Sequence, residues 1–443
     1  MTKKKDTLPQ EDRVLFTKEM RKDYTILIPT MLPRHFRIMA ALMRIHGYNA
    51  VLLENDGPEV IDYGLRYVHN DTCYPALLVI GQFLDAIENG GYDPHKVALL
   101  FTQTGGGCRA SNYISLLRKA LKRAGYGYIP VISLNFAGLE KNPGFHITLP
   151  LLRGLMYSVF YGDILLSLIN QCKPYEINQG ETEKLADEWT RRLTAQLGGK
   201  KKVKYKVIKQ TYREIVRDFY NIPKTQEEKV KVGIVGEIFV KFSPLANRNL
   251  EEYLISEGAE PRLAGLSDFA MFFLYTGIAD YDINRRKKKS HLILRFAYKV
   301  LKKKRQDINE AILAESNFDP LCDFDKVIKD VQRVISLGVK MGEGWLLPGE
   351  MLELIESGVE NVICAQPFGC LPNHIVGKGV MKPIKELYPE ANIIALDYDA
   401  SATAINQQNR IKLLLANATE RMKEKNALPT EAEAVEKVVE ATV

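Results

Sequence analysis

The chain has 443 residues and a formal net charge of +7, with 46% hydrophobic and 26% charged residues. This balance is typical of a folded globular protein and excludes an intrinsically disordered chain, and the length predicts more than one lobe. The six cysteines are too few and too scattered for a disulfide framework, so metal binding, catalysis and simple burial remain open for them.

The N-terminal segment, residues 1–23, is charged and is expected to be flexible. It has no apolar stretch of the kind that marks a secretory signal, so a cytoplasmic location is the expectation. In residues 24–150, short β-rich runs alternate with segments of helical spacing. The runs that we expect to form strands are YTILIPT, NAVLLE, KVALLFTQ and YIPVISLN. Such alternation predicts a mainly parallel sheet, so the first lobe is expected to be α/β.

Residues 151–225 form the next region, and their spacing favours helices. The apolar run ITLPLLRGLMYSVFYGDILLSLI crosses the start of this region, but a membrane span would have to bury the charges of Arg153 and Asp163. We therefore expect buried helices here and no membrane segment.

The α/β pattern returns in residues 226–420, which we expect to form a second lobe. A mainly helical insertion at about 266–345 interrupts this lobe, and an acidic, alanine-rich tail, residues 421–443, is expected to be flexible. The sequence thus predicts an α/β protein with two Rossmann-like parallel-sheet lobes and helical insertions.

Three basic clusters contribute much of the positive charge: KKKVKYKVIK from residue 200, RRKKKSH from 285 and KKKR from 302. No nucleic-acid motif accompanies them, and aromatic residues are not interleaved as a base-stacking platform requires, so no nucleic-acid partner is expected. A solvated face is the main interpretation, and a surface for docking or for a ligand phosphate is the alternative.

Three cysteines are predicted to lie at strand ends that lead into helices: Cys73 in NDTCYPALL, Cys108 in TQTGGGCRASNY and Cys370 in AQPFGCLPNHIVGKG. Ligands of parallel α/β sheets gather at such ends, and a helix N-terminus stabilises a thiolate. The pattern suits an iron–sulfur cluster, although the compact ferredoxin spacings are absent. A buried cysteine and a nucleophile remain open alternatives. The other three cysteines are expected to have core or surface roles: Cys172, Cys322 and Cys364.

Four segments resemble the 2-hydroxyacyl-CoA dehydratase superfamily of oxygen-sensitive iron–sulfur proteins: NDTCYPALL, TGGGCRASNY, VGEIFVKFSPLANRNLEEYLISEGAE and AQPFGCLPNHIVGKG. More specifically, the chain is similar to the C-terminal portion of large acyl-CoA dehydratase activase-related proteins, over residues 24–420. The resemblance implies that Cys73, Cys108 and Cys370 bind one 4Fe–4S cluster, or half of a double-cubane cluster, between the lobes. One iron would then have no protein thiolate.

The resemblance also implies a chain that accepts a low-potential electron from an ATP-hydrolysing activase with its own iron–sulfur cluster. The electron would serve radical dehydration of a 2-hydroxyacyl-CoA or reduction of a small molecule, in a homo- or heterodimer with a related subunit. No phosphate-binding loop is found, so no ATP site is expected in this chain. A non-catalytic electron relay or scaffold that docks an activase is the alternative. A structural zinc site is weaker, because only three cysteines are expected to converge.

Further residues near the cysteines are candidates for contacts with a cluster or its ligands: Gln103, Gly106, Gly107, Arg109, Glu237, Ser243, Gln366 and His374. The amides of Gln103 and Gln366 could tune a redox potential by hydrogen bonding. Lys241 could line the same cavity, although a loop-closing salt bridge or a helix cap explains this stretch about equally well. The sequence alone assigns no catalytic acid or base.

Overall fold

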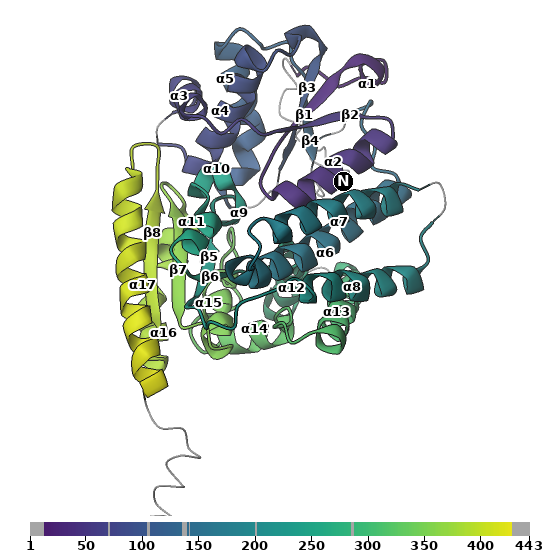
Figure 1. Cartoon of the computed structure of the whole chain (residues 1–443). Coiled ribbons are helices and arrows are strands. Elements are labelled where there is room, and N and C mark those ends of the chain that lie inside the picture. Colours follow the sequence, from purple (N-terminus) through teal and green to yellow (C-terminus); the bar gives the residue numbers. More distant parts are fainter. Residues whose placement is uncertain are drawn as a thin grey trace, which may run out of the picture.

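The computed structural model describes residues 13–69, 71–103, 107–134, 140, 142–199, 202–284 and 288–427. Within these ranges it contains two four-stranded sheets, and all neighbouring strands in both sheets are parallel. Figure 1 shows the first sheet in the upper lobe and the second sheet in the lower lobe, with a group of helices packed beside them. The prediction of an α/β protein with two Rossmann-like parallel-sheet lobes is confirmed.

The first sheet consists of β1 (Thr25–Pro29), β2 (Asn49–Leu53), β3 (Val97–Thr102) and β4 (Val131–Leu134). Their order is β2–β1–β3–β4, with the first strand between the second and the third. The helices of this lobe are α1 (Met20–Asp23), α2 (Pro33–Ile45), α3 (Pro58–Tyr67), α4 (Tyr74–Asn89) and α5 (Tyr113–Arg123). Leu27 of β1 faces the core that contains α4 and α5, whereas Ile26 faces the core beneath α2, because side chains alternate along a strand.

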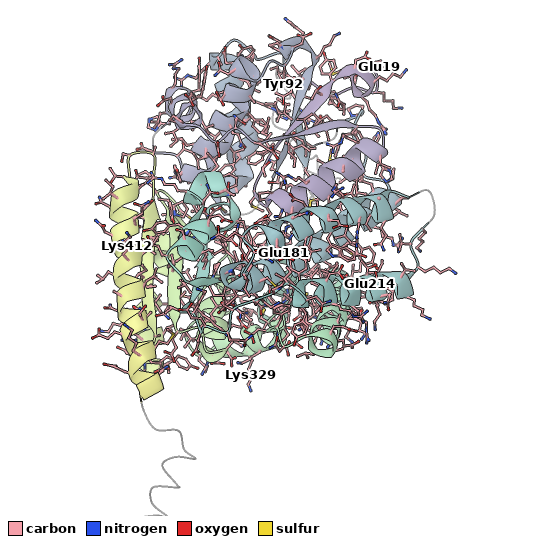
Figure 2. All side chains as sticks on the ribbon, viewed as in Figure 1. Glu19, Tyr92, Glu181, Glu214, Lys329 and Lys412 are labelled. Atoms are coloured by element: carbon pink, nitrogen blue, oxygen red, sulfur yellow. The ribbon has the colours of Figure 1, made fainter. Side chains whose placement is uncertain are left out.

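The second sheet consists of β5 (Lys231–Gly236), β6 (Glu260–Arg262), β7 (Asn361–Pro367) and β8 (Asn392–Tyr398). Their order is β6–β5–β7–β8, so the first strand again lies between the second and the third. The helices of this lobe are α9 (Ile238–Phe242), α10 (Pro244–Asn247), α11 (Leu250–Ser256), α15 (Leu346–Glu356), α16 (Met381–Leu387) and α17 (Ala404–Ala427). Figure 2 marks α17 by Lys412, whose Nζ lies 3.4 Å from Glu257 Oε1.

The remaining long helices are α6 (Leu149–Cys172), α7 (Glu181–Gly198), α8 (Tyr205–Tyr220), α12 (Leu266–Asn284), α13 (Lys288–Glu315) and α14 (Phe324–Val331). By length and composition alone, α6 could cross a membrane, but most of it is buried inside the protein. Phe160, Tyr161 and Ile164 are fully buried. The run that we expected to form buried helices is therefore one continuous core helix. Single turns of 3-10 helix and one π-helical turn lie at Pro94–Lys96, Arg109–Asn112, Lys173–Tyr175 and, for the π-helical turn, Asn373–Gly377.

Both ends of the described chain differ from the expected boundaries. Phe16 is fully buried in the core beneath α2, so residues 13–23 pack against the first lobe instead of forming a flexible segment. At the other end, α17 continues to Ala427, past the expected start of the flexible tail. The rest of the two segments expected to be flexible, 1–12 and 428–443, lies outside the described residues.

The two lobes share one hydrophobic core. Leu27 and Leu78 of the first lobe belong to the same buried cluster as Ile234 and Leu396 of the second. Helix α4 of the first lobe lies at this boundary and contacts α10 of the second. Packed side chains therefore join the lobes, in addition to the connecting chain.

A buried carboxylate joins the helical region to its neighbours. Asp163 of α6 is 1% exposed, and its Oδ1 lies 2.9 Å from His35 Nε2 of α2. The backbone N–H groups of Leu266 and Ser267, at the start of α12, donate to the same carboxylate at 2.8 Å each. Burial alone would raise the pKa of Asp163, but the hydrogen bonds from His35 and Ser267 and the attraction of His35 lower it below its ordinary value.

We expect Asp163→Ala to lower the free energy of unfolding by about 3–5 kcal/mol, because it leaves the His35 ring and buried N–H groups without an acceptor. Urea unfolding near neutral pH measures this change. Asp62→Ala, which removes an exposed carboxylate from α3, is the matched control and should change stability by less than about 0.5 kcal/mol. Equal losses in the two variants would contradict the role given to Asp163.

The same carboxylate predicts a loss of stability in acid. Because the pKa of Asp163 is lower in the folded protein than in the unfolded chain, its contribution is complete above the unfolded value of about 3.9 and disappears as the pH falls through the folded value. Urea unfolding over an acid pH series should therefore show a steeper fall for the wild type than for Asp163→Ala. Parallel curves would show that Asp163 does not contribute in this way.

Candidate functional site

Loops at the carboxyl ends of the central strands supply the candidate site. In each sheet the strand order reverses beside the first strand, between β1 and β3 and between β5 and β7, and ligands of open α/β sheets bind at such points. The loop after β3 carries Cys108, the loop after β7 carries Cys370, and Glu237 directly follows β5. Cys73, which we also expected at a strand end, is instead separated from β2 by α3 and directly precedes α4.

Cys73 and the Cys370 loop lie against each other across the boundary between the lobes. Tyr74 N donates to Phe368 O at 3.0 Å. Gly369 has a φ of +73°, and a Cβ added to it would lie 3.0 Å from Cys73 Cα. A glycine at this position therefore allows both the left-handed backbone and the close approach of the two loops.

The Cys108 loop contacts the same region from the first lobe. Arg109 donates a hydrogen bond from its guanidinium to Asp71 O, in the segment just before Cys73. Tyr113, the first residue of α5, has its Oη 2.7 Å from Cys73 Sγ. These contacts hold the Cys108 and Cys73 segments together, so the predicted thiols approach one another from distant parts of the sequence.

Burial dominates the electrostatics of the three thiols. Cys73 and Cys370 are 4% and 8% exposed, and Cys108 is the most open of the three. Burial raises the pKa of Cys73 to about 11 and also raises the pKa values of Cys108 and Cys370, and the negative charge of Glu237 adds to all three shifts. The thiols therefore lie within electrostatic range of one carboxylate. The backbone N–H of Ala76 lowers the pKa of Cys73, as expected at a helix N-terminus, but burial raises this pKa by more.

Two poorly hydrated carboxylates, Glu237 and Glu343, lie beside the thiols and form what we call the carboxylate pair. Val240 N donates to Glu237 Oε2 at 2.9 Å, and Ile238 N donates to Glu343 Oε1 at 3.1 Å. Burial raises the pKa of Glu237 to about 8, and repulsion by Glu343 adds to the shift. Burial also raises the pKa of Glu343. At neutral pH the carboxylate pair therefore holds a proton beside the thiols.

The short helix α9 is fixed from the other side by a buried ion pair. Lys241 Nζ lies 2.8 Å and 2.9 Å from the two carboxylate oxygens of Glu350 on α15, and both side chains are buried. Lys241 therefore forms a structural salt bridge, which is one of the two roles that the sequence left open for it. The same short helix presents Glu237, its N-cap residue, to the thiols.

Two flanking residues predicted from the sequence have structural partners in the first lobe. Gln103 Nε2 donates to Ser111 O at 3.0 Å, and Ser133 Oγ donates to Gln103 Oε1 at 2.8 Å. Ser243 is fully buried, and its Oγ lies 3.5 Å from Thr30 O at the boundary between the lobes. Both residues therefore shape the loops around the thiols.

Gln366 and His374 lie on the second-lobe side of the site. Gln366 is fully buried, and with its amide nitrogen oriented toward Asp397 it donates to Oδ1 at 3.1 Å and accepts from His374 N at 3.3 Å. The His374 side chain is exposed, and its Nδ1 lies 2.8 Å from Cys370 O. These contacts fix the backbone around Cys370, whereas the exposed part of the His374 ring can still meet a ligand.

Apolar side chains are exposed on the segments that flank the thiols. A Cβ added to Gly107 would lie 2.6 Å from Met341 Sδ, so the Cys108 loop packs closely against the insertion. Gly106, the other predicted glycine, lies outside the described residues. Four apolar side chains of the insertion and the Cys370 loop are more than half exposed: Met341, Phe368, Leu371 and Ile375.

Sequence reasoning missed three residues at the site. They are Tyr113, Glu343, which comes from the helical insertion, and Asn373, whose Nδ2 donates to Cys370 Sγ at 3.4 Å. Asn373 begins the π-helical turn just after Cys370, and such turns are frequent at functional sites. Asn373 follows Cys370 by three residues, and this short spacing could have identified it as a candidate. Nothing in the local sequence marks Glu343 as part of the site.

Three thiols with neighbouring backbone N–H groups are the donor types that iron–sulfur clusters use. Within the described ranges, no three His, Cys, Asp or Glu side chains are grouped closely enough to hold a single metal ion. A cubane cluster holds its cysteine ligands farther apart than a single ion does, so the donor set is compatible with a cluster. Neither a protein-family model nor a curated protein sequence matches the chain.

The carboxylate pair predicts that the metal-free protein loses stability as the pH rises. The folded protein keeps the Glu237 proton up to about pH 8, whereas the unfolded carboxyl loses it at about pH 4.3. The free energy of unfolding should therefore fall through this window, by up to about 1.4 kcal/mol per pH unit.

Glu237→Gln should flatten this fall, because the amide oxygen still accepts from Val240 but carries no charge. Denaturant unfolding at a series of pH values measures the slope. Glu214→Gln on the exposed side of α8, labelled in Figure 2, is the matched control and should keep the wild-type slope. A Glu237→Gln profile that coincides with the wild type would refute the assigned proton.

Proposed function

We propose that the chain is an iron–sulfur protein of the 2-hydroxyacyl-CoA dehydratase type. Cys73, Cys108 and Cys370 would bind one 4Fe–4S cluster, or half of a double-cubane cluster. The observation that supports this proposal best is the convergence of three thiols, from three distant parts of the sequence, around one carboxylate.

A cluster of this kind, when bound, supplies a low-potential electron and an iron that is open to a substrate oxygen. The proposed reaction is loss of water from a 2-hydroxyacyl-CoA, and reduction of a small molecule is the second reaction of this class. The protein's own contribution would be the proton of the carboxylate pair. A protonated carboxyl of Glu237 or Glu343 can give its proton to the hydroxyl group that leaves as water. The resulting carboxylate can accept the proton lost from the β-carbon, so the pair ends as it began.

The loops around the thiols would exclude water from the site and contact the substrate or a partner protein. Cys73 and Cys370 are nearly closed to solvent, so a substrate would enter from the side of Cys108. The exposed apolar side chains on the segments that flank the thiols suit an acyl chain or a protein surface that covers the site. The proposed partners are an ATP-hydrolysing activase with its own cluster and a second, identical or related, subunit. The proposed location is the cytoplasm.

A non-catalytic electron relay is the alternative function for the same three thiols. A relay needs no proton donor, and the sequence alone gave no acid beside the cysteines. The carboxylate pair provides one, with a proton held at neutral pH. This observation favours an enzyme over a relay or scaffold.

Metal analysis of protein purified without oxygen tests the proposal. We expect about four irons and four acid-labile sulfides per chain, with an EPR signal after reduction. Cys370→Ser should lose most of the iron, because one of three thiolate ligands is removed. Cys364→Ser, which changes a fully buried thiol inside β7, is the matched control and should keep it. Wild-type iron content in Cys370→Ser, or no iron after anaerobic reconstitution, would disprove the cluster.

A further inference from the structure

Two of the three basic clusters in the sequence meet on one face of the helical region. Helix α8 begins within the first cluster and α13 carries the third, and the two helices pack side by side (Figure 1). Glu214 marks α8 in Figure 2. The N-terminal part of α6 adds Arg153 to the same face.

Lys304 and Arg153 are two cations of this face whose charged groups lie against tyrosine rings. Lys304 Nζ lies 3.2 Å from the centre of the Tyr205 ring and 5.6 Å from the centre of the Tyr157 ring. Arg153 Cζ lies 5.3 Å from the centre of the Tyr157 ring, and the guanidinium donates to Val203 O. Both cations are half-buried, and within the described residues neither forms an ion pair with a carboxylate.

Two neighbouring lysines, Lys209 and Lys303, are neutralised by carboxylates. Lys209 Nζ lies 3.0 Å from Asp307 Oδ1 and 3.3 Å from Glu310 Oε2. Lys303 Nζ lies 3.4 Å from Asp307 Oδ1 and 3.3 Å from Glu310 Oε1. Lys304 and Arg153 are therefore the half-buried cations of this face that form no ion pair within the described residues, and the exposed Lys202, Lys204 and Lys206 add further positive charge.

Three further observations indicate that this charge has a missing partner. Burial and the positive charges of Arg153, Lys209 and Lys303 lower the pKa of Lys304 to about 8. The charged form of Lys304 is therefore less stable than that of an exposed lysine. Tyr205 Oη is buried and has no hydrogen-bond partner among the described residues. Tyr205 also begins α8, whose N-cap side chain makes no capping hydrogen bond. The positive end of the helix dipole therefore adds to the charge of the two cations.

We propose that Lys304, Arg153 and the first turn of α8 form a binding site for a phosphate-type oxyanion. An oxyanion with two negative charges can contact an ammonium, a guanidinium and backbone N–H groups at once, which a single carboxylate cannot do as well. The ligand is a small molecule, because Lys304 covers a face of the Tyr205 ring on which a nucleic-acid base would stack. The oxyanion is either free phosphate or the phosphate of a coenzyme. The proposal does not depend on the cysteine centre.

Acetylation of lysines in the wild-type protein, followed by peptide mass spectrometry, tests the site without any variant. Lys304 should react faster than exposed lysines, because more of its amine is unprotonated at a given pH. Inorganic phosphate, compared with sodium chloride at equal ionic strength, should slow its acetylation by about tenfold or more, since a bound anion raises the pKa of the amine by at least one unit. The exposed Lys378 and Lys382 should be unaffected. No slowing at Lys304, or equal slowing at all three lysines, would overturn the proposal.

Calorimetry with inorganic phosphate tests the residues themselves. Lys304→Gln and Arg153→Gln should each weaken binding by about tenfold or more, since each removes a charge-assisted hydrogen bond. Lys329→Gln removes the same charge from the exposed side of α14, labelled in Figure 2, and should leave the affinity unchanged. Equal weakening in all three variants would show a general effect of net charge and would overturn the site.

A comparison of coenzyme A with dephospho-coenzyme A shows whether the oxyanion is free phosphate or the phosphate of a coenzyme. Stronger protection of Lys304 by coenzyme A than by inorganic phosphate, lost with dephospho-coenzyme A, would identify the ribose phosphate of the coenzyme as the ligand. Equal protection by coenzyme A and inorganic phosphate would identify free phosphate. Both results support the site, and protection by none of the three compounds would reject it. Iron content is measured separately, so failure here leaves the cluster proposal untouched.

Discussion

The site depends on one constraint, which is that its thiol and carboxyl groups are buried away from water at the boundary between the lobes. A thiol or carboxyl group without hydration is more stable when it is neutral, and this explains the raised pKa values of Cys73, Cys370 and Glu237. The metal-free site therefore carries little negative charge. The proposed cluster would take the place of these protons, so its binding would be linked to proton release.

Both sheets have the same strand order, and this order places the thiols and the carboxylate at the boundary from which water is excluded. In both sheets the strand order reverses beside the first strand, and the loops at these points carry Cys108, Cys370 and Glu237. Gly236 shows how tightly one of them is built: its φ is +145°, and an added Cβ would lie 2.2 Å from Ala365 O of β7. A residue with a side chain could not end β5 there without moving the neighbouring strand, and Glu237 would move with it. The strands thus fix the positions, and the loops supply the chemistry.

Local patterns predicted the two sheets because buried parallel strands and helices of a dozen residues alternate clearly along the chain. The three cysteines could be identified because each stands next to an expected helix start. Properties set by tertiary packing were not accessible. Burial of Cys73 reverses the effect of its helix N-terminus, and Glu343 reaches the site from an insertion whose own sequence resembles any other helical stretch. Likewise, composition showed a basic cluster but not that Lys209 has carboxylate partners.

The continuous core also limits how a ligand can reach the thiols. Many two-lobed enzymes open and close about a hinge. Such a motion here would expose part of the buried cluster that contains residues of both lobes, at about 25 cal/mol for each Å² of apolar surface exposed. A ligand would therefore have to approach from the side of Cys108, the most open of the three thiols, while the lobes stay together. Exchange of ligands would then leave the overall dimensions of the molecule constant, and its rate would be set by the few residues beside Cys108.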